Sequence, residues 1–375
     1  MGHRLLIGTS KGLFILDPDS GEISGPHCDG WAINHVAAGQ GMIWAGGGGD
    51  FHGGGVWRSG DGGAKWALTR LSAGQIDAWA AEDPGVSEWS GLSFDPPPPF
   101  SDRFGAVWSL SFAHGVLRAG TKGAILLESP DGGETFEEVE TLSAYPGREG
   151  WNPGAVGLTL HTLVTDPGDE GKLWVGISAA GVFATEDGGA TWEARNRMSN
   201  AEASETHDHP AAPADGHVGG CVHNMVRATG SGDLLYQQNH HGVWRSADGG
   251  RSWDDVTTGL PSTFGFPIGV NPEDDQMIWT VPLNGDSVGR YPPDASAAVW
   301  RSVDGGETWE SKQTGLPTEK CYFTVLRQAM TTAPGGVWFG TNSGSVFASR
   351  DTGETWDEIA RHLPTILCLE AVALD

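Results

Sequence analysis

The sequence predicts an all-β fold, a seven-bladed β-propeller in which the last strand and the N-terminal strands share one blade. Two observations predict it. A short phrase recurs six times along the 375 residues, and short apolar strands alternate with turn residues without any helical period. Because repetition at a spacing of tens of residues marks a repeat architecture, we expect residues 1–375 to form a single propeller domain.

The repeated phrase reads Ser or Thr, any residue, Asp, any residue, Gly, two variable residues and then an aromatic residue. Ser, Thr and Asp side chains suit hydrogen bonds to the backbone N–H groups of a tight turn, and Gly supplies a positive φ there. The aromatic residue then starts the next strand. We therefore assign a structural role to the six aspartates, which are Asp61, Asp131, Asp187, Asp248, Asp304 and Asp351.

This phrase resembles the Asp-box, or bacterial neuraminidase (BNR) repeat, of sialidases and their β-propeller relatives. The whole chain resembles the bacterial sialidase-like and sortilin-like propellers of unassigned activity, also in its segments 157–162, 236–240 and 264–267. True sialidases use three arginines, a Tyr–Glu pair, an Asp and an early Phe/Tyr-Arg-Ile-Pro motif. That motif does not occur in this sequence, which holds only four Tyr, so we do not expect sialidase activity.

The strands between the phrases predict the number of blades. Each phrase follows a strand with a nearly constant end, as in Gly-Val-Trp-Arg at residues 55–58 and 242–245. The aspartates recur every 47 to 70 residues, whereas a four-stranded blade needs about 40–50, so several blades carry insertions. The chain begins with strand-like segments 4–9 and 12–16 and ends with the apolar run 366–374. We expect this run to be the inner strand of the N-terminal blade, which closes a ring of seven.

The insertions are expected on one face of the ring, because antiparallel strands place alternate loops on the same side. Long loops on a rigid scaffold are where binding usually occurs, so we place the functional site on that face. The four insertions cover about residues 71–103, 142–156, 197–219 and 282–297.

Composition excludes some partners. A formal charge of −26 and a pI near 4.7 argue against nucleic acid, whose binding needs Lys and Arg on phosphates, and against anionic membranes. The sequence enters a strand without an apolar leader and has no run of 18 apolar residues. The four cysteines lack zinc-type spacing, so we expect a cytoplasmic protein with free thiols.

Histidines on the inner strands suggest a metal site. Aligned by apolar pattern, these strands offer His35, Ser109, His161, His223, Phe266, Phe323 and Glu370 at equivalent positions. Three imidazoles would then converge near the axis, and His240 follows the second strand of its blade on the same face. Imidazole is a suitable ligand for iron, copper, manganese, nickel or zinc. A metal that is held by three or four histidines and keeps one coordination position open is typical of catalytic sites. The predicted metal ligands are His35, His161, His223 and His240.

The leading hypothesis is a metal-dependent enzyme with an axial pocket, acting on a carbohydrate or another oxygen-rich small molecule. Whether it is a hydrolase, a lyase or an oxygenase stays open. We expect Glu370 and His240 to be catalytic. The expected substrate-binding residues are Tyr145, Arg148, Trp151, Gln238, Asn239, Phe266 and His52.

Other interpretations compete with this one. A histidine in a strand is usually hydrogen-bonded structure, a buried cysteine such as Cys221, Cys321 or Cys368 is usually a small apolar group, and His207, His209 and His217 are typical loop residues. The chain could instead be a non-catalytic propeller that docks a protein or a glycan. A metal-free glycoside hydrolase would need two carboxylates about 5–10 Å apart. Its candidates, which the sequence does not pair, are Asp50, Glu149, Asp208, Asp286 and Glu370.

Overall fold

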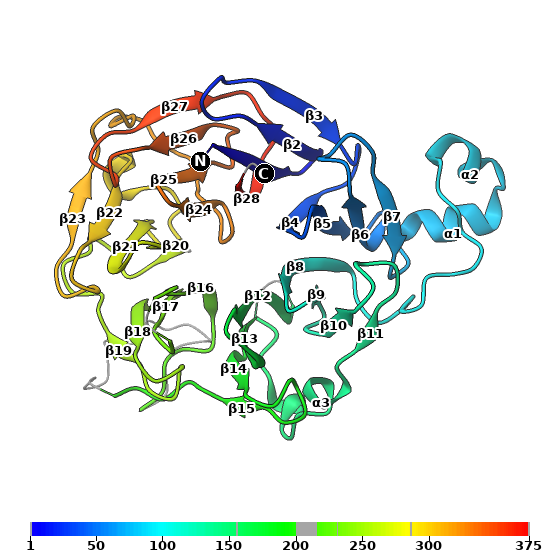
Figure 1. Cartoon of the computed structure of the whole chain (residues 1–375), viewed down its shortest axis with the longest axis horizontal. Helices are drawn as coiled ribbons and strands as arrows, with labels where there is room; N and C mark the ends of the chain where they lie inside the picture. The colour runs from blue at the N-terminus through cyan, green and yellow to red at the C-terminus, as the bar shows by residue number, and fades with distance from the viewer. Residues whose placement is uncertain (1, 155–156, 200–215, 231, 286, 374–375) are drawn as a thin grey trace.

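The computed structural model describes residues 2–154, 157–199, 216–230, 232–285 and 287–373. Within these ranges the chain forms a ring of antiparallel four-stranded meanders around a central axis, with the two ends of the chain side by side (Figure 1). The predicted all-β propeller with a shared N- and C-terminal blade is confirmed.

Each blade runs from an inner strand near the axis to an outer strand at the rim (Figure 1). Blade 1 consists of β28 (Ile366–Ala373), β1 (His3–Thr9), β2 (Gly12–Leu16) and β3 (Ile23–His27). Blade 2 consists of β4 (Ile33–Gly39), β5 (Met42–Gly49), β6 (Gly53–Ser59) and β7 (Ala67–Arg70). Blade 3 consists of β8 (Ala106–Ala113), β9 (Val116–Lys122), β10 (Leu126–Ser129) and β11 (Glu137–Glu138).

The remaining blades follow the same order. Blade 4 consists of β12 (Thr159–Asp166), β13 (Asp169–Ser178), β14 (Gly181–Thr185) and β15 (Glu193–Ala194). Blade 5 consists of β16 (Val222–Arg227), β17 (Leu235–Asn239), β18 (Gly242–Ser246) and β19 (Asp254–Asp255). Blade 6 consists of β20 (Gly265–Asn271), β21 (Asp274–Pro282), β22 (Val299–Ser302) and β23 (Glu310–Lys312). Blade 7 consists of β24 (Met330–Ala333), β25 (Gly336–Gly340), β26 (Val346–Ser349) and β27 (Asp357–Ala360).

The ring closes through blade 1. Strand β28 pairs antiparallel with β1 from His3↔Ala373 to Thr9↔Ile366, with one register shift after Gly8. This pairing joins the two ends of the chain in one sheet and covers the inner edge of β1, which closes the ring.

The repeated phrases form identical turns, which we call repeat turns. In all six, the Ser or Thr hydroxyl donates to the Asp carboxylate at 2.7–2.9 Å. The same hydroxyl accepts the N–H of the Gly four residues later at 2.7–3.0 Å. That Gly has a φ between 86° and 98° in every turn, a region that side chains with a Cβ rarely adopt. The local chemistry of the phrase thus explains its composition.

Repeat turns also join neighbouring blades. A tryptophan on the second strand of one blade donates its indole N–H to a carbonyl in the repeat turn of the next blade. The pairs are Trp44 with Gly132, Trp174 with Gly249 and Trp279 with Thr352, at 2.7–3.1 Å. Because these indoles are buried, each bond also satisfies a donor that water cannot reach.

Short helices occur in the inserted loops, between blades and, for η2, between β21 and β22 of blade 6, where the sequence predicted only loops. They are α1 (Gln75–Glu82), α2 (Gly85–Ser90), α3 (Glu140–Ser143) and the 3-10 turns η1 (Arg148–Gly150) and η2 (Pro293–Ala295). Helices this short bury very few apolar residues, such as Ile76 and Val86, so they leave no 3.6-residue pattern to detect. None of the helices in the described residues has the length and apolar character that crossing a bilayer requires.

The repeat turns predict a stability effect. Replacing Ser302 with Ala leaves the buried N–H of Gly306 without its hydroxyl acceptor, which should cost about 1–3 kcal/mol. The matched control is Ser311→Ala on the exposed outer strand β23. Denaturant unfolding of both variants measures the difference. Equal midpoints for the two variants would contradict a structural role for the repeat turns.

Candidate functional site

The inner strands contain a recurrent β-bulge near the loop-rich face. On β12 the register shifts between Leu160 and Thr162, which leaves His161 at the bulge. On β16 it shifts between Val222 and Asn224, which leaves His223 there. On β4 the residue at the bulge is Asn34, one position before His35. A one-residue offset turns a side chain to the other side of a strand, so His35 is not the equivalent of the other two.

Polar side chains near these bulges bind the inner strand of the next blade. Each donates to a backbone carbonyl across the blade interface. The pairs are Asn34 with Val107, Ser109 with Leu160, Ser178 with Val222 and His223 with Gly265, at 2.5–2.9 Å. These polar residues therefore hold neighbouring blades in register.

His161 and His35 belong to this structural set. Both ring nitrogens of His161 have hydroxyl partners, Thr162 at 2.9 Å and Ser178 at 3.0 Å. Burial, aided by the charge of Arg327, lowers the pKa of His161 to about 3. Nδ1 of His35 accepts the N–H of Leu110 at 3.2 Å, and burial lowers the pKa of His35 to about 4. Both rings are neutral near pH 7, and neither joins the group that could hold a metal.

Residues 321–329, which we call the axial segment, contact the inner strands of several blades. Sequence analysis placed Phe323 on an inner strand, but the inner strand of blade 7 starts only at Met330. The Gln328 amide donates to the carbonyl of His161 at 2.8 Å and to Oδ1 of Asn224 at 3.2 Å. Its own carbonyl accepts the N–H of Leu369 at 2.8 Å. The axial segment thus connects β28, β12 and β16 across the ring.

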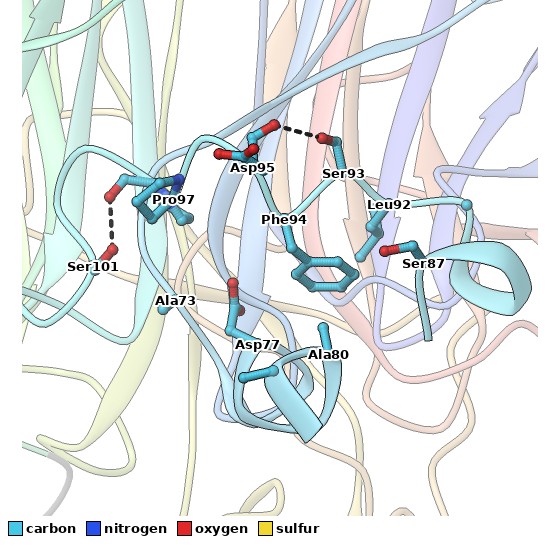
Figure 2. A pocket seen from close by; sticks show the side chains of 13 residues that line it. Ala73, Asp77, Ala80, Ser87, Leu92, Ser93, Phe94, Asp95, Pro97 and Ser101 are labelled. Carbon is cyan, nitrogen blue, oxygen red and sulfur yellow. Dashed lines mark hydrogen bonds between the residues drawn. The ribbon is translucent and has the colours of Figure 1, made fainter. Parts of the chain in front are cut away.

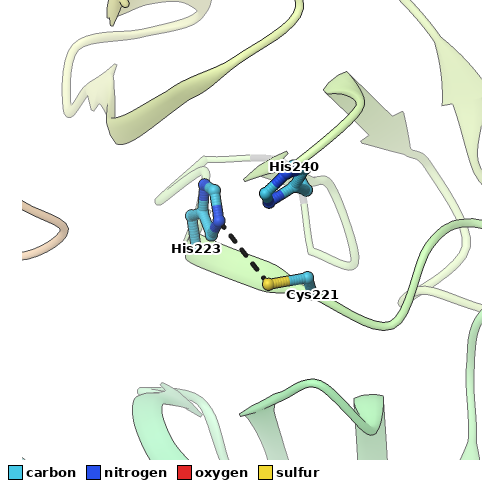
Figure 3. Close-up of side chains that lie close together, drawn as sticks. All are labelled: Cys221, His223 and His240. Carbon is cyan, nitrogen blue, oxygen red and sulfur yellow. Dashed lines mark hydrogen bonds between the residues drawn. The ribbon is translucent and has the colours of Figure 1, made fainter. Parts of the chain in front are cut away.

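Cys221, His223 and His240 come together on blade 5, and we call them the axial cluster (Figure 3). Their ligand atoms all lie within 4.8 Å of one another. Sγ of Cys221 is 3.6 Å from Nε2 of His223. The carbonyl of Gly265 lies 2.5 Å from Nδ1 of His223, so Nδ1 carries the proton and the Nε2 lone pair faces the thiol. Two of the four predicted metal ligands are brought together, and Cys221 joins them.

Aromatic rings and arginines surround the axial cluster. The His223 ring lies 5.2 Å from the ring of Phe264 and 4.7 Å from that of Phe266. The Arg327 guanidinium lies 4.8 Å above Phe266, and Arg290 approaches the same ring at 5.8 Å. Burial, with the charge of Arg327 as the second cause, holds the pKa of His223 well below its usual range. The sequence offered no periodic signal for either arginine, because both lie in non-repeating segments.

Gln238 and Asn239 shape the turn that carries His240. Gln238 donates to backbone carbonyls, among them that of Thr263 at 3.0 Å, and accepts the Thr280 hydroxyl at 3.1 Å. Oδ1 of Asn239 accepts the N–H of His241 at 2.7 Å. Both amides are buried and engaged within the protein.

Glu370 lies apart from the axial cluster. It lines a groove of about 580 Å³ together with the turn between β4 and β5. The axial segment forms hydrogen bonds both to Leu369, next to Glu370, and to Asn224, next to His223. Burial raises the pKa of the Glu370 carboxyl to about 7, partly offset by a bond from the Thr331 hydroxyl. The expected catalytic pair of Glu370 and His240 is therefore not brought together.

Other predicted binding residues pack away from the inner strands. Tyr145 and Trp151 cover Phe183 on β14 at 5.0 and 4.7 Å, and Arg148 lies 4.6 Å over the Trp151 ring. His52 stacks on Trp31 in blade 2 at 4.7 Å. Glu149 and Asp50 are exposed on separate loops, and His217 forms an isolated bridge with Arg197. His207, Asp208, His209 and Asp286 lie outside the described residues.

A hollow of about 800 Å³ lies beside α1 and α2 (Figure 2). Its lining includes Leu92, Phe94 and Asp77. The Asp77 carboxylate already pairs with Arg70 at 2.6 Å and accepts the N–H of Gly74 at the start of α1. The Asp77 carboxylate therefore serves to hold α1 in place.

Comparison with known proteins places the chain among propellers. No family profile matches it. It is 26% identical over 293 residues to a xyloglucanase of Hypocrea jecorina, covering 72% of this chain and 31% of that protein. It is 23% identical over 220 residues to an oligoxyloglucan-reducing end-specific xyloglucanase of Emericella nidulans, covering 52% and 25%. The chain thus spans about a third or less of the length of these curated relatives.

Solved structures with the same fold include a GH74 xyloglucanase of Xanthomonas campestris, with a TM-score of 0.61 and 15% identity over 96% of this chain and 53% of that one. YCF48 from Cyanidioschyzon merolae has a TM-score of 0.55 and 15% identity over 88% and 84%. At these identities the likeness establishes the β-propeller fold, which serves glycoside hydrolases and other proteins alike.

Glu370 predicts a pH effect on stability. Its folded-state pKa of about 7 exceeds the unfolded value of about 4.3. Between these values the folded state binds more protons, so Glu370 lowers stability as the pH rises. Relative to Glu370→Gln, the wild type should lose about 2–3 kcal/mol between pH 5 and pH 8, since one pKa unit corresponds to about 1.4 kcal/mol. Denaturant unfolding at both pH values measures the difference in unfolding free energy between the wild type and Glu370→Gln, with the exposed Glu88→Gln as control. A difference that does not change with pH would refute the prediction.

Proposed function

We propose that the chain is a propeller enzyme that binds a divalent transition metal through Cys221, His223 and His240 and acts on a carbohydrate. One observation carries the proposal: a thiol and two imidazoles lie within 4.8 Å of one another and come from neighbouring elements of blade 5, at the loop-rich side of the ring.

One distance within the axial cluster suits a metal. With a metal–sulfur bond of about 2.3 Å, a metal–nitrogen bond of about 2.0–2.1 Å and a tetrahedral angle, the sulfur and nitrogen of two ligands lie about 3.5 Å apart. The observed separation between Cys221 and His223 is 3.6 Å. The bond from Nδ1 of His223 to Gly265 is the type of outer contact that orients a metal-binding imidazole.

The ligand types narrow the choice of ion. Among iron, copper, manganese, nickel and zinc, a thiolate with imidazoles favours zinc or copper over manganese, which prefers oxygen ligands. Three protein ligands leave one position open, and a metal so held activates water or polarises a substrate oxygen. Phe264 and Phe266, both buried beside His223, exclude water from that side of the cluster.

A carbohydrate is the substrate class that the relatives support. The sequence matches are to xyloglucanases, and a GH74 xyloglucanase shares the fold. Because the chain covers only part of those enzymes, their own reaction is not assigned to it. The six repeat turns support membership in the sialidase-like Asp-box group. The lack of a disulfide among the four cysteines accords with the expected cytoplasmic location; both remain proposals.

A second candidate function is the docking of a protein. The two largest exposed aromatic side chains of the inserted helices, Trp79 on α1 and Trp89 on α2, are 50% and 61% exposed. An apolar partner covering both would explain their exposure. This surface belongs to the insertion after blade 2 and does not involve the axial cluster.

Elemental analysis of protein purified without chelators or added metal tests the proposed function. The wild type should retain close to one equivalent of zinc or copper. Cys221→Ser and His240→Ala should each lower the metal content at least tenfold without a comparable loss of thermal stability. Cys321→Ser is the matched control, because that buried thiol donates to Pro317 outside the cluster. A wild type without metal even after reconstitution, or variants that retain it fully, would overturn the proposal.

A further inference from the structure

We infer that Arg290 and Arg327 form an anion-recognition site beside the axial cluster, so that the carbohydrate substrate carries a carboxylate or a phosphate group. This inference deepens the proposed function and rests on it, because it takes the axial cluster as the place where the substrate binds.

The two arginines reach the same aromatic surface from different parts of the chain. Arg327 belongs to the axial segment, and its Cζ lies 4.8 Å from the ring centre of Phe266. Arg290 comes from the long loop between β21 and β22 and lies 5.8 Å from that ring and 6.0 Å from the ring of Phe264. A guanidinium held over an aromatic face keeps N–H groups at its edge for planar oxyanions, which it binds in a bidentate manner.

Neither arginine has an acidic partner in the described part of the chain. Elsewhere in this acidic protein, arginines pair with glutamates, as Arg58, Arg195 and Arg301 do. Nε of Arg327 is shielded from solvent and has no hydrogen-bond partner among the described residues, as is also true of Nε in Arg70, Arg227 and Arg301. Those three arginines, however, pair with carboxylates through their other nitrogens. A partly buried cation without a counter-ion is costly, and an oxyanion supplies the charge and the acceptors that it lacks.

The surroundings of Arg327 concentrate positive charge. After burial, the charge of Arg327 is the next cause that lowers the pKa of His161, which lies outside the axial cluster. Arg290 and Arg327 both approach the ring of Phe266, so two positive charges lie close together. On a chain with a formal charge of −26, such a local positive potential attracts small anions to one place.

Calorimetric titration of metal-free protein with glucuronate, glucose 6-phosphate and glucose tests the inference. At least one of the two anionic sugars should bind at least tenfold more tightly than glucose, and the one that binds distinguishes a carboxylate from a phosphate preference. Arg290→Gln, an exposed position, should weaken that binding at least tenfold. Arg327→Lys keeps the charge but loses the bidentate fork, so it should weaken binding too. Arg350→Gln, whose arginine pairs with Asp19 outside the cluster, should bind like the wild type.

Equal binding of glucose and the anionic sugars, no binding of either anionic sugar, or unchanged binding in Arg290→Gln and Arg327→Lys would overturn the inference. The metal content of the same preparations, measured before chelation, distinguishes failure of this inference from failure of the proposed function. Anion binding without any retained metal would leave the arginine site standing and remove the metal enzyme. Metal retention without anion binding would do the reverse.

Discussion

The antiparallel pairing of β28 with β1 is the constraint on which the other features of this propeller depend. A ring of blades closes only when its first and last blades meet, and here one blade contains both ends of the chain. Closure fixes the inner strands around a common axis. The bonds of Asn34, Ser109, Ser178 and His223 to the next blade then set blades 2 to 6 relative to one another.

Within that ring, a β-bulge and an irregular segment bring the residues of the candidate site together. The bulge on β16 turns His223 toward Gly265 and Cys221, and the axial segment replaces regular strand with a path that brings Arg327 over Phe266. Gln328 ties the same segment to β12 and β16. Since a bulge and an irregular segment cost ladder hydrogen bonds, their occurrence beside the axial cluster accords with a functional role for this region.

The sequence predicted what is encoded locally. Each repeat turn lies within eight residues, so its hydroxyl, carboxylate and glycine could be recognised without knowing the fold. The C-terminal strand could be assigned because the N-terminal blade lacked an inner strand of its own. The axial cluster was predicted only in part, because its formation depends on register. Apolar alternation could not show that the bulge falls at Asn34 on β4 but at His161 on β12. Arg290 and Arg327 lie in segments without repetition, and no pattern connected them.

The charges around the axial cluster connect the proposed metal site with the proposed anion site. If the proposed metal binds, a thiolate from Cys221 and two neutral imidazoles would hold a divalent cation with a net charge of about +1, by the ordinary charges of these ligands. Arg327 lies near enough for its charge to affect His223, and Arg290 approaches the same ring. Cations held this close in a partly buried place repel one another. A substrate oxyanion would relieve that repulsion and could fill the open metal position, so the metal and the arginines would act on one group rather than as separate sites.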